Sequence, residues 1–182
     1  MRKHIIDIET NGLEPVKEDH RILAIGLDGD VIMHREEKRV LEEFWSRLEG
    51  YSQLVGFNID EFDIRFILVR SVKHRVPVKR FTTLDLRKVL ANRQYRVGGT
   101  LSDYCRVLGV EDGDKLTGAE MVDAGRRWLQ GDEEGGNLIR SHLRWDLCKT
   151  SELHDLLVDM GLVAKVTDPL AAGRPQPLMA SQ

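Results

Sequence analysis

The sequence lacks a long apolar run and contains only two cysteines. No apolar stretch approaches the roughly 20 residues that cross a bilayer, so we expect no membrane-embedded segment. The N-terminal residues 1–4 lead into a short apolar stretch that Asp7 and Glu9 already interrupt, whereas a secretory signal needs a longer uncharged core. Cys105 and Cys148 show no metal-ligand spacing and are expected to be reduced thiols. These absences predict a soluble, cytoplasmic protein.

The residues that are present suit one globular domain. With 182 residues, 41% of them hydrophobic and 31% charged, the chain can bury one core but not two large ones. We place this domain at residues 1–165. From Thr167 onward Pro, Gly, Ala, Ser and Gln dominate, so residues 166–182 are predicted to form a disordered C-terminal tail.

The net charge of −3 conceals an uneven distribution. The segment from Ile64 to Gly99 holds ten Lys and Arg against one acid, Asp85, and is therefore +9, which leaves −12 on the rest of the chain. Such asymmetry suggests a phosphate-bearing partner. A solvated helix face accounts for the basic segment equally well.

Apolar periodicity predicts an α/β order in which a hairpin comes first, helices and strands then alternate, and helices end the chain. The expected strands span 4–9, 21–27, 31–34, 53–57 and 82–86. The expected helices span 40–48, 62–73, 100–108, 117–129 and 137–160. Asp28-Gly29-Asp30 is a hairpin turn, and residues 132–136 are expected to separate the last two helices. The pattern favours a mixed β-sheet flanked by α-helices.

The first expected strand carries Asp7 and Glu9 among Ile5, Ile6 and Ile8. Residues two apart in a strand point to the same face, so both carboxylates share one face and the opposite face is apolar. Like charges beside an apolar strand repel each other, and a divalent cation such as Mg²⁺ or Mn²⁺ relieves that repulsion. A half-exposed strand with polar outer positions also accommodates this pair taken alone.

Further acids follow at two other places in the chain. Asp60, Glu61 and Asp63 come after the fourth expected strand, near the sheet edge where open α/β folds bind ligands. Acids at a helix start also complement the helix dipole, which is the interpretation we favour for Asp60 and Glu61. On the last expected helix, His142 and Asp146 share a face because they are four residues apart.

Together these segments form three ordered motifs: Asp7-x-Glu9-Thr10, Gly56-Phe57-Asn58-x-x-x-Phe62-Asp63 and His142-x-x-x-Asp146. They resemble the motifs of the DEDD superfamily of 3′–5′ exonucleases. The sequence looks most like the proofreading exonuclease domain of B-family DNA polymerases and its small stand-alone relatives. The resemblance covers about residues 4–160 and implies an RNase H-like fold in a single domain.

The resemblance also implies a chemistry. The enzyme would be a 3′–5′ exonuclease that hydrolyses single-stranded nucleic acid, DNA in preference, to nucleoside 5′-monophosphates. It would use two divalent metal ions, Mg²⁺ or Mn²⁺. The ligands that the resemblance implies for these ions are Asp7, Glu9, Asp63 and Asp146.

His142 departs from the pattern of the family. Members with a histidine set it five residues before the last aspartate, where this chain has Ser141, whereas members with the four-residue spacing carry a tyrosine. We assign His142 as the catalytic group that orients or deprotonates the attacking water. An imidazole suits that task because it titrates far nearer to neutral pH than a phenol does.

By the same resemblance, the substrate-binding residues are expected to contact the terminal nucleotides, and they are Thr10, Asn11, Gly12, Leu13, Asn58 and Phe62. Leu13 would wedge against a base, Phe62 would stack, and the basic segment would follow the phosphate backbone. Stacking accepts every base, so low sequence preference is expected. Ordinary core packing is the alternative for Leu13 and Phe62.

Other functions remain open at this stage. An RNA 3′–5′ exonuclease would use the same site. A catalytically silent nucleic-acid-binding subunit would be expected to lose ligand residues, yet all four acids are present. A structure-specific endonuclease would cut within strands. The expected partners are DNA or RNA 3′ ends, and the protein acts alone, as a homodimer or with a replication or repair partner.

Overall fold

Strand β1 occupies the middle of a five-stranded sheet with the order β3-β2-β1-β4-β5. The computed structural model describes residues 2–92, 98–110 and 116–164. The strands are β1 (Arg2–Thr10), β2 (Ile22–Leu27), β3 (Asp30–Met33), β4 (Ser52–Gly56) and β5 (Phe81–Asp85). β2 pairs antiparallel with both β1 and β3, whereas β4 pairs parallel with both β1 and β5. The predicted α/β class with a mixed sheet is confirmed.

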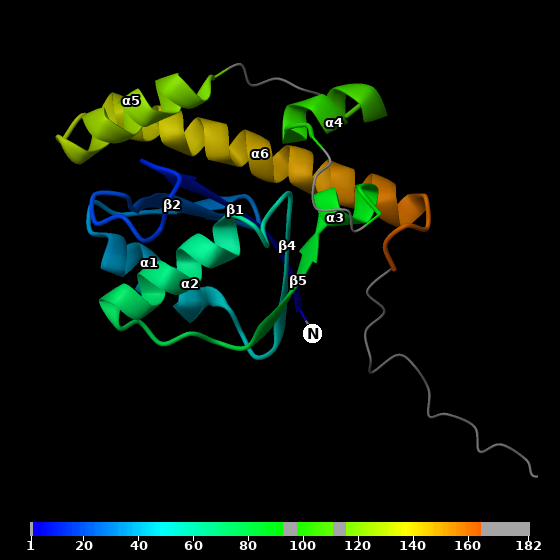
Figure 1. Ribbon diagram of the computed structural model, residues 1–182, viewed down its shortest axis with the longest axis horizontal. Helices are drawn as coiled ribbons and strands as arrows, with labels where there is room; N and C mark the ends of the chain where they lie inside the picture. The colour runs from blue at the N-terminus through cyan, green and yellow to red at the C-terminus, as the bar shows by residue number, and fades with distance from the viewer. Residues whose placement is uncertain (1, 93–97, 111–115, 165–182) are drawn as a thin grey trace, which may run out of the picture.

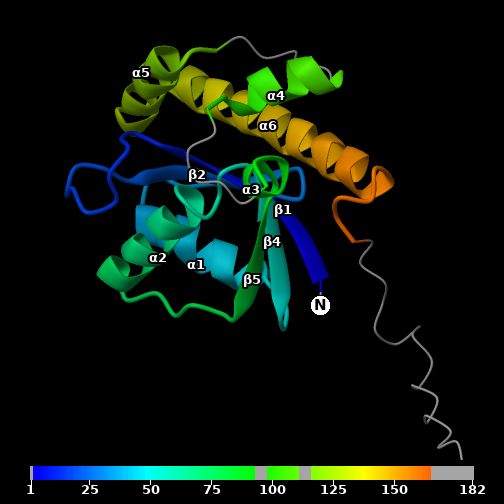
Figure 2. The same cartoon turned by 45° about the vertical axis from the view of Figure 1, so that its right-hand side comes forward.

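Helices cover both faces of this sheet (Figures 1 and 2). They are α1 (Glu37–Arg47), α2 (Asp63–His74), α3 (Leu86–Leu90), α4 (Leu101–Leu108), α5 (Gly118–Leu129) and α6 (Glu133–Asp159). The helices α1 and α2 lie on one face. The long helix α6 crosses the other face, with α4 and α5 packed along it. Each expected helix and strand is therefore found, with bounds that shift by a few residues.

Local sequence signals explain several of these bounds. Asp28 and Gly29 both adopt positive φ, 53° and 90°, as a two-residue turn between β2 and β3 requires. Thr100 caps the N-terminus of α4 and Thr117 that of α5, and each forms a capping box with the acid three residues later.

The largest difference concerns the start of α6. The last two helices are separated at residues 130–132 and not at the expected 132–136, because Asp132 caps α6 and the first turn of α6 continues through Gly135 and Gly136. A Cβ on Gly135 would lie 2.6 Å from the carbonyl oxygen of Ala124, and one on Gly136 would lie 2.7 Å from the Trp128 ring. These glycines therefore serve close packing of α6 against α5 and do not break the helix.

Strand alternation assigns each side chain of β1 to a face. Ile6 and Ile8 belong to the core beneath α1 and α2, whereas Ile5 packs with Leu147 of α6. The odd-numbered residues of β1 thus point toward α6, and Asp7 and Glu9 follow Ile5 on that side.

Three further expectations concern the domain boundary, the C-terminal tail and membrane-spanning helices. The domain boundary at residue 165 and the disordered tail at 166–182 lie outside the described residues. Within the part of the chain that the structure describes, no helix combines the length and apolarity needed to cross a membrane.

Candidate functional site

The four acids of the predicted ligand set line one pocket of about 350 Å³. Asp7 and Glu9 reach it from β1, Asp63 from the first turn of α2, and Asp146 from the middle of α6. Three elements that are distant in sequence therefore deliver carboxylates to one place. The convergence that the motifs predicted is present in the fold.

Asp63 is the most buried of these acids. Its side chain is buried, and its Oδ1 atom has no hydrogen-bond partner among the residues that the structure places. Burial, together with the nearby charges of Glu9 and Asp85, raises the pKa of Asp63 to about 8, although the backbone N–H groups of Asp63 and Ile8 partly lower it. A buried carboxylate oxygen that lacks a donor suits a cation as its partner.

Asp7 has the same electrostatic character. Burial raises the pKa of Asp7 well above its usual value, and the carboxylates of Asp63, Asp146 and Glu9 raise it further. Acids that raise one another's pKa in this way favour the binding of positive charge between them. The donor set, which consists of carboxylate oxygens, fits hard divalent ions such as Mg²⁺ and Mn²⁺.

His142 lies against two of these carboxylates. Its Nε2 atom is 3.3 Å from Oε1 of Glu9 and 3.4 Å from Oδ2 of Asp146. Glu9, His142 and Asp146 can each offer one ligand atom, and these atoms lie within 4.8 Å of one another. The histidine that was expected to handle the water is therefore placed where it can also contact an ion.

Sequence reasoning missed Lys149, which is buried beside the site. Its Nζ atom lies 2.8 Å from Oδ1 of Asp146, three residues earlier on α6. The i,i+3 spacing on a long helix was the available signal. It carries little weight alone, because most lysines are solvated. In the structure Lys149 holds the carboxylate of Asp146 in one orientation.

Asp85 was given no role in the site, although Thr83-Leu84-Asp85-Leu86 also echoes the DEDD exonucleases. Its buried side chain caps α3 and accepts hydrogen bonds from the backbone N–H groups of Asn58 (3.0 Å) and Asp60 (3.3 Å). Asp85 thereby fixes the loop that follows β4 and leads to Asp63.

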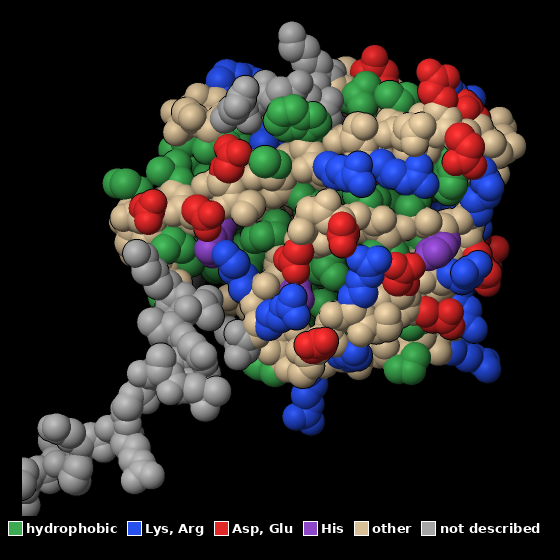
Figure 3. All heavy atoms as spheres, turned by 180° about the vertical axis from the view of Figure 1, so that it is seen from behind, with side chains coloured by type: hydrophobic (Ala, Val, Ile, Leu, Met, Phe, Trp, Pro, Cys, Tyr) green, Lys and Arg blue, Asp and Glu red, His purple; other side chains and the backbone are tan. Residues whose placement is uncertain are grey.

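The Lys and Arg side chains of the basic segment do not form one continuous basic surface. Arg70 is buried in an ion pair with Glu37, and Lys88 pairs with Asp60 and Glu61. On the face seen in Figure 3, Lys and Arg side chains are interspersed with Asp and Glu. Of the described residues that line the acidic pocket, Arg87 alone is a cation. Two further members, at positions 93 and 96, lie outside the described residues.

A second pocket, of about 510 Å³, adjoins the first. Its lining includes Thr10, Gly12, Leu13, Phe62, Glu9 and His142, together with Gly118, Ala119, Met121 and Val122 of α5. Leu13 is 79% exposed, which excludes core packing for it. Phe62 lines both pockets and also packs against Phe66, with ring centroids 5.6 Å apart. The apolar walls suit a flat, partly apolar group such as a base.

The loop between β1 and β2 is held by its own contacts. The Asn11 carboxamide donates to the carbonyl of Asp19 (2.9 Å) and accepts from the N–H of Arg21 (2.6 Å). Gly12 permits the close approach of His20, whose ring would lie 2.3 Å from a Cβ. Asn11 and Gly12 therefore have structural roles, and their contact with nucleotides stays a prediction.

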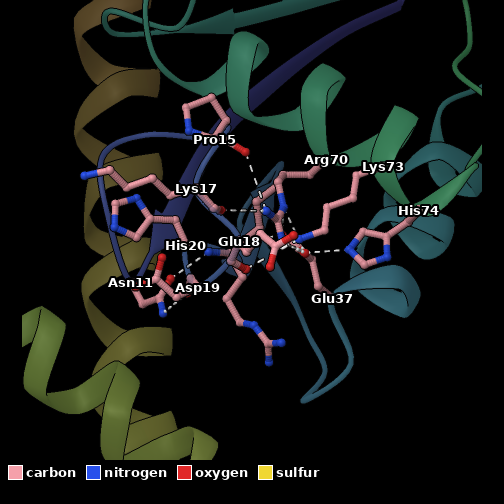
Figure 4. Close-up of polar contacts among 12 residues, drawn as sticks. Asn11, Pro15, Lys17, Glu18, Asp19, His20, Glu37, Arg70, Lys73 and His74 are labelled. Carbon is pink, nitrogen blue, oxygen red and sulfur yellow. Dashed lines mark hydrogen bonds and ion pairs between the residues drawn. The ribbon is translucent and has the colours of Figure 1, made fainter.

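Arg70 anchors this loop from α2, as Figure 4 shows. Its guanidinium donates to the carbonyl oxygens of Pro15 (3.5 Å) and Lys17 (3.2 Å) while it pairs with Glu37. Glu37 also accepts from the N–H of Ile22 (2.7 Å), where β2 begins. The buried ion pair thus fixes both the loop and the strand that follows it.

Two comparisons with known proteins relate this chain to others. A family described as the RNase H superfamily matches residues 4–158. The chain is also similar to an uncharacterized protein of Methanocaldococcus jannaschii, with 43% identity over 177 residues that cover 90% of this chain and 99% of the relative. The family match runs from within β1 to within α6 and includes each acid of the pocket.

Proposed function

This chain belongs to the RNase H superfamily, and from that premise we propose that it is a 3′–5′ exonuclease. It hydrolyses phosphodiester bonds of single-stranded nucleic acid, DNA in preference, and releases nucleoside 5′-monophosphates. On the basis of the three ordered motifs, the proposal groups the protein with the DEDD exonucleases, near the proofreading domains of B-family DNA polymerases. The observation that carries the proposal is the meeting of Asp7, Glu9, Asp63 and Asp146 in one pocket.

The carboxylates of that pocket would hold two divalent ions, Mg²⁺ or Mn²⁺. When bound, such ions would supply activation of the attacking water and neutralisation of charge on the departing 3′ oxygen. The protein's own part is to place its carboxylates in advance. Lys149 fixes Asp146 by a 2.8 Å contact, and burial holds Asp63 where its Oδ1 atom needs a partner. This preorganisation matters because a misplaced metal ligand greatly lowers the rate of the catalysed reaction.

His142 would orient or deprotonate the attacking water through Nε2, the ring nitrogen that faces Glu9 and Asp146. The second pocket would receive the terminal base, with Leu13 against one side of it and Phe62 at the junction of the two pockets. Apolar walls contact any base, so the enzyme would show little sequence preference.

The test is digestion of matched single-stranded DNA and RNA oligonucleotides that carry a 5′ label. Each would be incubated with Mg²⁺, with Mn²⁺ or with a chelator. We expect a ladder that shortens from the 3′ end, only with metal and faster on DNA, together with nucleoside 5′-monophosphates. Asp7→Asn serves as the inactive control, because it removes one carboxylate of the pocket without changing its size.

Three outcomes would redirect the proposal. Faster digestion of RNA than of DNA would make the protein an RNA 3′–5′ exonuclease with the same mechanism. Cleavage of a circular strand would indicate an endonuclease. A labelled strand that stays intact with every metal, yet shifts in a binding assay, would mean a catalytically silent nucleic-acid-binding subunit and would end the nuclease proposal.

A further inference from the structure

Arg87 occupies an unusual place, because it is a cation in a pocket lined by four carboxylates. A nucleic acid strand that enters this pocket brings negative phosphates toward negative side chains. Like charges repel each other, and the repulsion is stronger near a protein surface than in bulk water. A fixed positive group in the pocket lining offsets that repulsion.

We propose that Arg87 is a phosphate-binding residue for the backbone of the strand near its 3′ end, and that Asn58 is the residue that positions it. The inference rests on the proposed function, since it assigns the substrate contact to the same pocket. It changes the role expected for Asn58, which holds the guanidinium and does not itself need to touch the nucleotide.

One buried carboxylate fixes both residues. Oδ1 of Asp85 accepts from the backbone N–H of Asn58 and from the backbone N–H of Arg87, each at 3.0 Å. The Arg87 side chain contacts the loop after β4, where its Nη1 atom donates a hydrogen bond to Oδ1 of Asn58 at 2.9 Å. The loop after β4 and the start of α3 are therefore locked together with the guanidinium between them.

Asn58 suits this place because of its backbone. Its φ is 62°, in the left-handed region that asparagine tolerates better than most residues. Its side-chain oxygen is an uncharged acceptor, so it orients the guanidinium without neutralising it. A planar guanidinium can donate two parallel hydrogen bonds to a phosphate, whereas a lysine ammonium acts as a point charge.

Lys88 provides a matched comparison, since it is the next residue and carries the same charge. Its Nζ atom lies 3.0 Å from Oδ2 of Asp60 and 3.1 Å from Oε1 of Glu61, and it is not among the described residues of the pocket lining. Removal of either charge changes the net charge equally. Only the loss of Arg87 should therefore weaken a contact inside the pocket.

The experiment compares Arg87→Gln, Arg87→Lys, Lys88→Gln and Asn58→Gly. Affinity for a fluorescent single-stranded DNA is measured in chelator at several salt concentrations, and KM and kcat are measured in Mn²⁺. Glycine replaces Asn58 because it accepts the positive φ, and thermal melts confirm that each variant is folded.

We expect Arg87→Gln to raise Kd and KM roughly tenfold or more, as loss of a charge-assisted hydrogen bond does, with a smaller change in kcat. The slope of log Kd against log salt should fall by about one. Arg87→Lys should recover part of the affinity, Asn58→Gly should show a weaker form of the same defect, and Lys88→Gln should resemble the wild type.

A neutral methylphosphonate, placed at one linkage at a time near the 3′ end, then locates the contact. At one linkage the methylphosphonate should weaken binding by the wild type but not by Arg87→Gln. The neutral linkage and the variant each remove one partner of the same arginine–phosphate contact, so the second change has nothing left to remove. If Arg87→Gln and Lys88→Gln behave alike, or no linkage shows this coupling, the inference about Arg87 is wrong while digestion by the wild type still supports the nuclease. Arg87-dependent binding without digestion would support the inference and contradict the nuclease.

Discussion

Nε2 of His142 lies 3.3 Å from Oε1 of Glu9, so the long helix α6 and the central strand β1 meet at an imidazole–carboxylate contact. The same nitrogen is 3.4 Å from Oδ2 of Asp146. In this position His142 could act as a base for the attacking water or as a metal ligand, and experiments can distinguish these two roles.

We expect His142→Ala to lose most of the turnover while it keeps Mn²⁺ binding, because all four carboxylates remain in the pocket. Turnover is measured on single-stranded DNA, and binding by titration calorimetry. Ser141→Ala, at the neighbouring exposed position of α6, is the control and should behave as the wild type. Near-wild-type turnover would remove His142 from the mechanism. A parallel loss of Mn²⁺ affinity would make it a ligand.

The raised pKa of Asp63 predicts a pH dependence. Its pKa is about 8 in the folded protein against an ordinary value of 3.8. Without metal, the folded state therefore keeps a proton that the unfolded chain releases above about pH 4. The stability from this group is complete below that pH and is lost as the pH rises through about 8. Divalent ions compete with the proton, so Mn²⁺ affinity should rise over the same window. Melting temperatures with and without Mn²⁺, across this range, measure both effects.

The matched variants for this prediction are Asp63→Asn and Asp60→Asn. The first should raise the melting temperature of the ion-free protein near pH 8, because the amide carries no charge at this buried position, and should reduce the stabilisation by Mn²⁺. The second changes a partly exposed acid that pairs with Lys88 and should leave both values nearly unchanged. A stabilisation by Mn²⁺ that is constant with pH would contradict the assignment of Asp63.

The buried pair of Arg70 and Glu37 should control the order of the β1–β2 loop. Arg70→Met leaves Glu37 without its main partner and releases the carbonyls of Pro15 and Lys17, so we expect a loss of about 3–5 kcal/mol in unfolding free energy. Trypsin should also cleave faster after Lys17. Lys73→Met, which loses only a 3.4 Å contact to the carbonyl of Glu18, is the control. Equal cleavage of the two variants would show that Arg70 does not hold the loop.

The close approach of α5 and α6 predicts opposite effects of two glycine substitutions. Gly135→Ala should destabilise the protein by about 1–3 kcal/mol, because the new Cβ would lie 2.6 Å from a backbone oxygen of α5. Gly118→Ala meets no atom within 4 Å in a helix and should be neutral or stabilising by up to about 1 kcal/mol. Urea denaturation of both variants tests the pair. A neutral Gly135→Ala would mean that the two helices can separate at little cost.

Periodicity predicted which acids share a face, and the resemblance of the three motifs to the DEDD exonucleases predicted that the four acids meet. Alternation in a strand puts Asp7 and Glu9 on one face, and the four-residue spacing puts His142 beside Asp146. The position of Asp63 at the start of a helix after a strand places it at the edge of the sheet. The RNase H superfamily match then confirms the fold that these motifs implied.

What escaped prediction depends on contacts between distant residues. Arg70 looked like one more solvated charge, because its partner Glu37 lies on another helix. The buried roles of Lys149 and Asp85 depend on how α6 and the loop after β4 pack. The first turn of α6 was misassigned because Gly135 and Gly136 resemble a break unless the facing residues of α5 are known.

The central position of β1 has a consequence for the way the protein can be handled. This strand is paired on both edges and supplies Asp7 and Glu9, while their companions come from α2 and from α6, at the far end of the described chain. No proteolytic fragment that omits either end of this span can present the complete set of acids. Capture of a divalent ion should therefore coincide with cooperative folding of the whole unit, which makes ion-induced protection from proteases a direct assay of correct assembly.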